Sequence, residues 1–400
     1  MKQMTQNNNY FDGHSTNPLF ETKKPLNTDI TPTHEQFVGR EEEKEQVGNI
    51  LKDLVRGDIP ENFLLTGNTG YGKTACTKLL LNDLSQKLDD DFTYLYISDC
   101  PTENKVLREI SERLELGSKA KNNRVLYNLI KEEIIEEDLK VVIVLDEVDV
   151  LFRGRHDHGN PLFKKLFELR GNVLNNSDGC LVLAGVTNVV DIMEDFDPRV
   201  KSRFDSSNVI QFSSYNAFQL EKILEKRKQQ AFKNEVVKEG VVKKVAAKVA
   251  QEDGDARKAI QMLKKAGEIA ERNDDEMVRL SHVDQASNLI EKNRVMDAVK
   301  SLPKQEKLVL YAILDMRQKE AKTGEVFSHY EKLGEKEDIA TLTQRRVGDL
   351  IGDLDMQGLI TAKTENLSGS RGRTRKIKYD YSSELEQKIT NHIEDKLCIK

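Results

Sequence analysis

The sequence predicts an α/β domain built on a parallel sheet, followed by an all-helical domain and a small domain of helices and a hairpin. Strand and helix patterns alternate over residues 37–212, helical patterns alone follow over residues 213–293, and residues 294–400 combine helical patterns with two short strand patterns. Alternating strands and helices are typical of a parallel sheet with helices on both faces. A chain of 400 residues is also too long for one ordinary core, so several domains are expected.

The individual elements follow from the spacing of apolar residues. In the first domain we expect strands at residues 62–66, 92–98, 141–146, 180–186 and 208–212, and helices at residues 41–55, from 73 onward, 103–116, 124–136 and 161–174. The run at 141–146 is apolar until its last residue, as in a strand buried on both faces. Further helices are expected at residues 217–232, 236–251, 256–272, 281–293, 304–317, 324–333, 343–356 and 383–397.

Composition and charge exclude several classes of protein. The chain is 38% hydrophobic and 32% charged, and no stretch approaches the roughly 20 apolar residues that span a bilayer. The first residues lack the apolar core of a signal peptide, so we expect a cytoplasmic, nucleoid-associated protein without membrane contact. The net charge of −6 argues against a protein that coats nucleic acid, but a local basic patch suffices for DNA binding.

Three features of the sequence carry no expected chemistry of their own. Residues 1–36 are polar and contain three prolines, which predicts a disordered tail. The four cysteines form no CxxC pair and are expected to be reduced thiols. His156 and His158 have no matching ligands elsewhere, so a solvated polar loop is favoured over a metal site.

A phosphate-binding loop is predicted at residues 67–74, GNTGYGKT, between an expected strand and an expected helix. Its glycines (Gly67, Gly70 and Gly72) allow a tight turn that aims backbone N–H groups at phosphate oxygens, and the following helix adds the positive end of its dipole. Lys73 would contact the β and γ phosphates, and Thr74 would supply a hydroxyl to Mg²⁺. Tyr71 and Ala75, which lie in and just after this loop, are assigned to the same nucleotide site.

Polar residues that complete hydrolysis chemistry follow two other buried strands. Asp146 would hold the Mg²⁺ shell and Glu147 would polarise the attacking water. Asn188 follows the strand at 180–186 and could contact the γ phosphate, because ligands lie beyond the carboxyl ends of parallel strands.

Arginines at two further places could reach the nucleotide. Arg199 and Arg203, in DPRVKSRF, could act on the ATP of a neighbouring subunit, with Arg203 as the assigned catalytic residue. Arg257, in GDARKAI, lies near the start of a helix of the second domain and could close over the phosphates.

The C-terminal segment predicts a winged-helix DNA-binding domain. Apolar residues at helical spacing place basic residues at the start of the helix at 343–356, where a recognition helix meets the major groove. A hairpin with a Gly/Ser-rich tip and five basic residues between 371 and 378 could lie along phosphates or enter the minor groove. The expected DNA-contacting residues are Gln344, Arg345, Arg346, Arg371, Arg373, Arg375 and Lys376.

In this order, the motifs resemble those of the AAA+ superfamily, and more narrowly those of the archaeal origin-recognition initiators. The likeness runs from about residue 37 to about residue 381 and includes FVGRE at 37–41, YNAFQLEKILEKRKQQAF at 215–232, GDARKAI, TQRRVGDLIGDL and GRTRKIKY. By position, the resemblance implies that Val38, Gly39 and Arg40 border the adenine and that Tyr215 and Arg227 line the nucleotide. It also implies that the segment from Ser98 to about Lys121 is an insertion that contacts DNA.

The resemblance implies an ATP-dependent initiator that recognises replication origins. ATP and ADP with Mg²⁺ would set the angle between the first domain (the base) and the all-helical domain (the lid), and slow hydrolysis would act as a switch. The implied partners are double-stranded origin DNA, other initiator copies and the replicative MCM helicase. Two alternatives stay open: a DNA-binding ATPase of plasmid partitioning or transposition, and a signalling P-loop NTPase with a winged helix, although such signalling proteins usually lack the lid arginine.

Overall fold

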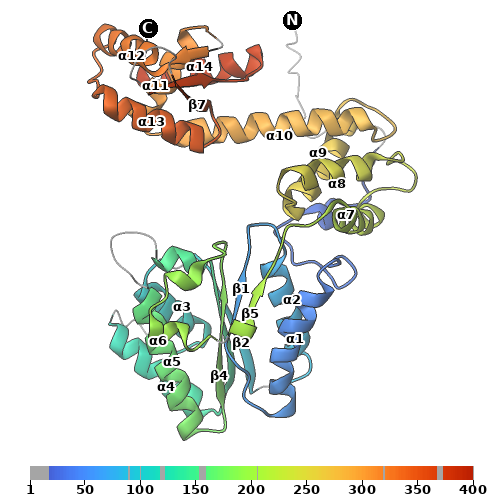
Figure 1. Cartoon of the computed structure of the whole chain (residues 1–400). Coiled ribbons are helices and arrows are strands. Elements are labelled where there is room, and N and C mark those ends of the chain that lie inside the picture. Colours follow the sequence, from blue (N-terminus) through green and yellow to red (C-terminus); the bar gives the residue numbers. More distant parts are fainter. Residues whose placement is uncertain are drawn as a thin grey trace, which may run out of the picture. The chain divides into compact units, whose positions relative to one another are not determined.

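A computed structural model describes residues 18–88, 91–99, 101–117, 122–152, 159–204, 206–318, 320–366 and 373–399 (Figure 1). The chain divides into two compact units, residues 1–286 and residues 287–400. The first unit contains a base with a five-stranded sheet and a helical lid, and the second contains helices and a small antiparallel sheet.

The base is built on a parallel sheet with the strand order β2-β3-β4-β1-β5. Its strands are β1 (Phe63–Thr66), β2 (Phe92–Ile97), β3 (Lys140–Asp146), β4 (Cys180–Val186) and β5 (Val209–Gln211), and every pairing is parallel. All seven residues of β4 are buried, because this central strand has neighbours on both edges and helices on both faces. The carboxyl ends of β1, β3 and β4 therefore meet at one edge of the sheet.

Helices cover both faces of the sheet (Figure 1). One face packs against α3 (Glu103–Arg113), α4 (Asn123–Glu136) and α5 (Gly159–Asn176). The other packs against α1 (Glu41–Arg56) and α2 (Lys73–Ser85). Three short helices, η2 (Val148–Phe152), η3 (Ile192–Glu194) and α6 (Pro198–Lys201), and the turn η4 (Ser206–Asn208) complete the base.

The lid contains α7 (Ala217–Ala231), α8 (Val241–Glu252) and α9 (Ala256–Arg272), followed by the start of α10 (Leu280–Ser301). Asn216 caps the start of α7 with a capping box: its side chain accepts from the Gln219 N–H, and the Gln219 side chain accepts from the Asn216 N–H. The expected domain boundary after residue 293 falls inside α10, and the two units meet between residues 286 and 287.

The expected disordered tail is wrong for residues 18–36, which pack on the lid. Leu19 and Leu26 are each 1% exposed, and the 3₁₀ helix η1 (Lys24–Leu26), which contains Leu26, packs on α7 and α9 of the lid. The Phe20 ring lies 4.4 Å from the Phe232 ring, and the Leu19 N–H donates to Glu271 at 3.0 Å. The few apolar residues of this polar stretch are sufficient to hold it in place, because they pack against apolar residues of the lid. Residues 1–17 lie outside the described residues.

The second unit has the winged-helix order of elements. It contains α11 (Lys304–Asp315), β6 (Glu320–Lys322), α12 (Thr323–Lys336), α13 (Gln344–Met356), β7 (Thr361–Asn366), β8 (Arg373–Lys378) and α14 (Ser383–Leu397). The strands form an antiparallel sheet in the order β6-β8-β7, so the hairpin gains a third strand that the sequence did not predict. Strand β6 has three residues and too little alternation to stand out.

Some expectations fall outside the described residues: the loop with His156 and His158, Cys100, and the part of the expected insertion at residues 118–121. Cys76 and Cys180 are buried free thiols and Cys398 is an exposed one. None of the helices in the described part of the chain combines the length and apolar character that a bilayer crossing requires.

Substitution of Phe20 by Ala tests whether the N-terminal segment stabilises the lid. Phe20 is 7% exposed and packs against Phe232 and Gly267, so its truncation should lower the free energy of unfolding by about 3 kcal/mol in urea denaturation of the full chain. Phe218→Ala on α7 is the matched control, because the Phe218 side chain is 63% exposed and its loss should leave stability unchanged. Equal effects of the two substitutions would contradict the packing role.

Candidate functional site: a nucleotide pocket and a DNA interface

The phosphate loop turns between β1 and α2 with a backbone that requires glycine. Gly70 and Gly72 have φ angles of +80° and +97°, in the left-handed region. A Cβ atom on Gly70 would lie 1.7 Å from Asp255 Oδ1, and one on Gly72 would lie 2.6 Å from the Tyr215 hydroxyl. Both glycines are therefore needed for the turn and for the close approach of the lid.

Lys73 carries a buried charge at the first position of α2. It is 5% exposed, and its Nζ donates to the carbonyl oxygens of Gly67 and Asn68 and, at 3.0 Å, to Asn188 Oδ1. Burial lowers the pKa of Lys73 to about 8, against the opposing effect of the nearby Asp146 carboxylate. The sequence expected Lys73 and Asn188 at one site, and the fold joins them by a hydrogen bond.

Asp146 is the centre of an oxygen cluster beside the loop. The Thr74 hydroxyl donates to Asp146 Oδ2 at 3.0 Å, the Tyr96 hydroxyl donates to the same oxygen, and the Glu147 N–H donates to Oδ1 at 2.9 Å. Burial, followed by the charge of Asp146, raises the pKa of Tyr96, so its hydroxyl stays protonated. The hydroxyl and carboxylate oxygens fit Mg²⁺, which prefers oxygen ligands and keeps several waters.

A buried carboxylate that sequence reasoning missed holds Asn188. Asp149 is 3% exposed and accepts from the Thr187 hydroxyl at 3.1 Å and from the Asn188 N–H at 3.4 Å. These bonds connect η2 to the end of β4. The signal was present in the acidic run DEVD, but the sequence does not say which of its carboxylates turns inward.

The lid touches the phosphate loop through the turn that precedes α9. The Ala256 N–H donates to the Gly70 carbonyl oxygen at 3.3 Å, and the Tyr71 hydroxyl donates to the Asp253 carbonyl oxygen at 2.9 Å. Asp255 caps α9 by accepting from the Arg257 N–H at 2.7 Å, and burial raises the pKa of this carboxyl group. The cap orients the first turn of α9, from which Arg257 projects.

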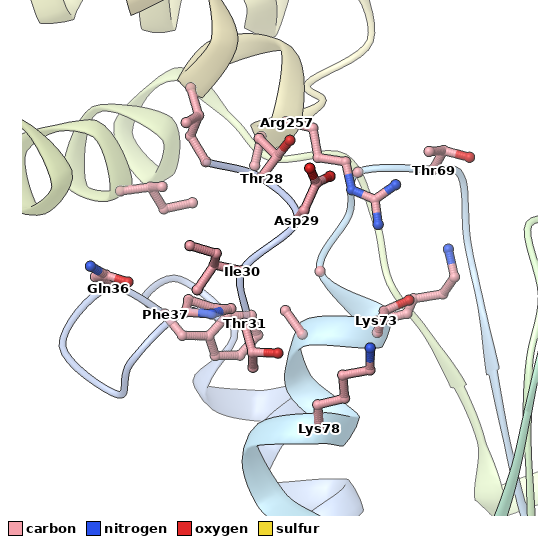
Figure 2. A pocket seen from close by; sticks show the side chains of 18 of the residues that line it. Thr28, Asp29, Ile30, Thr31, Gln36, Phe37, Thr69, Lys73, Lys78 and Arg257 are labelled. Carbon is pink, nitrogen blue, oxygen red and sulfur yellow. The ribbon is translucent and has the colours of Figure 1, made fainter. Parts of the chain in front are cut away.

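A pocket of about 430 Å³ lies between base and lid. Figure 2 shows Arg257 above the pocket, residues 28–31 along one wall, and Lys73 and Lys78 on the opposite wall. The expected site residues that line the pocket are Val38, Gly70, Gly72, Lys73, Thr74, Ala75, Asp146, Glu147, Asn188, Tyr215, Arg227 and Arg257. Lining residues that sequence reasoning missed include the segment 28–32, Gln36, Phe37, Lys78 and Ile260.

Four expected nucleotide residues, Gly39, Arg40, Gly67 and Tyr71, do not line this pocket. Arg40 is 2% exposed, and its guanidinium donates to the Tyr71 carbonyl oxygen at 3.0 Å and to Glu43 at 2.7 Å. It also lies 3.8 Å from the centre of the Tyr215 ring. Contrary to the implied adenine contact, Arg40 joins α1, the loop and the start of the lid from behind the pocket.

Tyr215 and Arg227 lie where lid and pocket meet. Tyr215 is 3% exposed, and burial raises its pKa to about 12. Arg227 is 6% exposed and donates to the carbonyl oxygen of Pro25, so it also holds the N-terminal segment against α7. Burial lowers the pKa of this guanidinium.

The candidate trans arginines lie outside the pocket of their own chain. Arg199 and Arg203 are exposed on and just after α6, and neither lines the pocket. The α6 helix is fixed by Asp197, whose side chain accepts from the Arg199 and Val200 N–H groups. This location is compatible with action on a neighbouring subunit, which stays a prediction.

In the second unit, α13 presents its N-terminal basic residues to solvent. Its apolar residues, Val347, Leu350, Ile351 and Leu354, are buried in the core of the domain, as the helical spacing predicted. Gln344, Arg345 and Arg346 are exposed on its first turn, which Thr343 caps. Arg346 pairs with Asp349 at 3.5 Å on the surface.

The two faces of β8 use their basic residues differently. Arg375 lies on the face of the buried Ile377 and donates to the Gly348 carbonyl oxygen of α13 at 3.0 Å. Lys376 and Lys378 lie on the other face and pair with Glu320 of β6. Arg371 lies outside the described residues, and Arg373 begins β8. The structure therefore engages Arg375 and Lys376 with the domain itself.

Three protein-family models match the chain. An AAA domain matches residues 60–193, a Cdc6 AAA+ ATPase-type lid domain matches residues 221–288, and a CDC6 C-terminal winged-helix domain matches residues 297–388. Nucleotide binding follows from the AAA domain with its phosphate loop. The matched regions cover the base, the lid and the second unit in turn.

Whole-chain relatives agree with these domains. The ORC1-type DNA replication protein 1 of Sulfurisphaera tokodaii is 36% identical over 393 residues, 96% of each chain, and that of Archaeoglobus fulgidus is 33% identical over 392 residues, 95% of this chain and 93% of the relative. The Aeropyrum pernix ORC1 protein in complex with DNA has a TM-score of 0.76 at 30% identity, covering 94% of this chain and 97% of that one. Together with the geometry of the phosphate loop, lid and winged helix, this similarity shows that the chain belongs to the ORC1/Cdc6 family of AAA+ DNA replication proteins.

Proposed function

We propose that the chain is an origin-recognition initiator that binds ATP with Mg²⁺ and hydrolyses it slowly, as a switch for its grip on double-stranded origin DNA. The observation that carries the proposal is the convergence of the phosphate loop, Asp146, Asn188 and the lid residue Arg257 around one pocket. A ligand seated there contacts base and lid together, so its presence and its number of phosphates bias the angle between them.

The positions of the pocket residues suit them to separate roles in nucleotide binding and hydrolysis. Lys73 supplies positive charge to the phosphates, and Thr74 and Asp146 would hold Mg²⁺, which supplies charge neutralisation at the phosphates when bound. Glu147 lines the pocket, is exposed and has a φ of +56°. It is suited to orient the attacking water, with Asn188 beside the phosphates.

Arginines would complete the site from two directions. Arg257 lines the pocket from α9 and would stabilise phosphate charge when the lid closes. Arg203 would act on the nucleotide of a second initiator copy, because it lies outside the pocket of its own chain. Hydrolysis would then depend on assembly of initiator copies.

DNA binding would use the first turn of α13 and the hairpin of β7 and β8, which is the wing of the winged helix. Arg345 and Arg346 are exposed on the helix that would enter the major groove, and the ion pair of Arg346 with Asp349 lies at the surface. Lys376 is paired with Glu320 and is the weaker candidate. The DNA complex of the A. pernix relative supports this proposal by similarity. Loading of the replicative MCM helicase is proposed from the family alone, and similarity to replication proteins over 96% of the chain argues against partitioning, transposition and signalling ATPases.

Substitution of Glu147 by Gln should separate binding from hydrolysis. Without its carboxylate, ATP turnover should fall by about a hundredfold or more, while ATP affinity stays unchanged. Turnover is measured by phosphate release and affinity by titration with a fluorescent ATP analogue. Glu136→Gln, at the exposed end of α4, is the control. Full turnover in Glu147→Gln would remove Glu147 from the mechanism.

The pH dependence of ATP affinity tests the buried charge of Lys73. Below pH 8 Lys73 is charged with or without nucleotide, so it contributes no pH dependence there. Bound phosphates raise its pKa, so above pH 8 binding takes up a proton and affinity falls as pH rises. Titrations on both sides of pH 8 measure this slope. Lys73→Arg should lose it because a guanidinium stays charged, and a flat wild-type profile would refute the assignment.

Charge reversal of Arg345 and Arg346 to Glu tests the recognition helix. Affinity for origin fragments should fall, and the slope of log affinity against log salt should become shallower, since two positive charges at the DNA surface are lost. Lys396→Glu, on the exposed surface of α14, serves as the control. Unchanged affinity and slope in the double variant would place the DNA contact elsewhere.

A further inference from the structure

One hydroxyl in the nucleotide site has no role in the chemistry described above. Asp146 Oδ2 accepts hydrogen bonds from two side chains, the Thr74 hydroxyl of the phosphate loop and the Tyr96 hydroxyl of β2. Tyr96 does not line the pocket and would touch neither nucleotide nor metal. Its hydroxyl donates to the carboxylate proposed to hold Mg²⁺.

The register of the sheet places Tyr96 beside Asp146. Tyr96 pairs with Val144 across the parallel β2–β3 ladder, and Asp146 follows Val144 by two residues. Side chains two residues apart on a strand point to the same face, so Tyr96, Val144 and Asp146 share one face. This is the face that α2 covers, and α2 carries Thr74.

The aromatic ring of Tyr96 is held in place by core packing and by a lysine side chain. Tyr96 is 9% exposed and belongs to the core between sheet and α2. Lys78, one turn after Thr74, places its Nζ 4.4 Å from the centre of the ring. A ring fixed by the core below and by a cation above has little freedom to turn its hydroxyl away from Asp146.

These bonds define what Asp146 can still do. Oδ2 is engaged by two hydroxyls, and Oδ1 accepts from the Glu147 N–H at 2.9 Å and keeps one acceptor direction free. Because Thr74 donates its proton to Asp146, the lone pairs of the Thr74 oxygen are free for a cation. Asp146 would then serve Mg²⁺ by orienting Thr74 and by accepting from a water of the metal's shell.

We propose that Tyr96 is a positioning residue for Mg²⁺-dependent nucleotide binding, acting through Asp146. The inference rests on the proposed function, since it concerns the same site. Loss of the Tyr96 hydroxyl leaves Oδ2 with one donor instead of two, so the carboxylate can rotate and Thr74 loses its fixed orientation. Removal of such an outer partner of a metal ligand typically costs between about tenfold and a hundredfold in metal affinity.

Tyr96→Phe tests this inference in the full-length chain, because it removes the hydroxyl and keeps the ring. Affinity for a fluorescent ATP analogue is measured in EDTA and at increasing Mg²⁺, which yields the Mg²⁺ concentration at half-maximal tightening. We expect that midpoint to rise roughly tenfold in Tyr96→Phe, with unchanged affinity in EDTA. Thermal unfolding of the variant checks that the fold is kept.

Tyr94→Phe is the matched control on the same strand and the same face. Its hydroxyl donates to Asn82 on α2, away from Asp146, so its loss should leave the Mg²⁺ midpoint unchanged. The inference is overturned by a wild-type midpoint in Tyr96→Phe, by an equal loss of affinity in EDTA, or by the same shift in Tyr94→Phe. Equal ATP affinity of the wild-type protein in EDTA and in Mg²⁺ would instead contradict the proposed function.

Discussion

The contact between the lid turn at Gly254 and Asp255 and the phosphate loop organises the first unit. Ala256 donates to the Gly70 carbonyl oxygen, and the space at Gly70 is so small that no side chain fits against Asp255. The same carboxylate caps α9 and thereby directs Arg257 toward the pocket. The base and the lid are therefore connected by a backbone hydrogen bond and by the Asp255 helix cap. A ligand that moves the phosphate loop also moves the lid turn.

Two buried positive charges, Lys73 and Arg40, lie close to this contact, and different groups stabilise each of them. Lys73 is surrounded by carbonyl and amide oxygens and has a lowered pKa, whereas Arg40 combines Glu43, backbone carbonyls and the face of Tyr215. Burying the charge of Lys73 without a phosphate partner costs free energy, so an anion bound beside it would be stabilised. Arg40 has its partners already and serves the architecture.

The N-terminal segment gives the lid a second attachment. Phe20 packs on Phe232, Arg227 donates to Pro25, and residues 28–32 then form a wall of the nucleotide pocket. The lid, the pocket and the entry to α1 are thus tied by one stretch of chain. A nucleotide in the pocket would contact this wall, which connects lid stability to occupancy of the site.

The sequence by itself determined the order of the AAA domain, the lid and the winged helix, most of the strands and helices, and the motif residues Lys73, Thr74, Asp146, Asn188 and Arg257, which line the pocket. It could do so because apolar periodicity and phosphate chemistry are local signals. The helix expected at 236–251 begins at Val241, and the one expected at 281–293 continues to Ser301. Only the tertiary structure decided that Arg40 faces the core, that Asp149 and Tyr96 support the site residues, that residues 18–36 pack on the lid, and that Lys376 is paired with Glu320. Those outcomes depend on which segments the sheet register and lid docking bring together, and no short stretch of sequence encodes such long-range contacts.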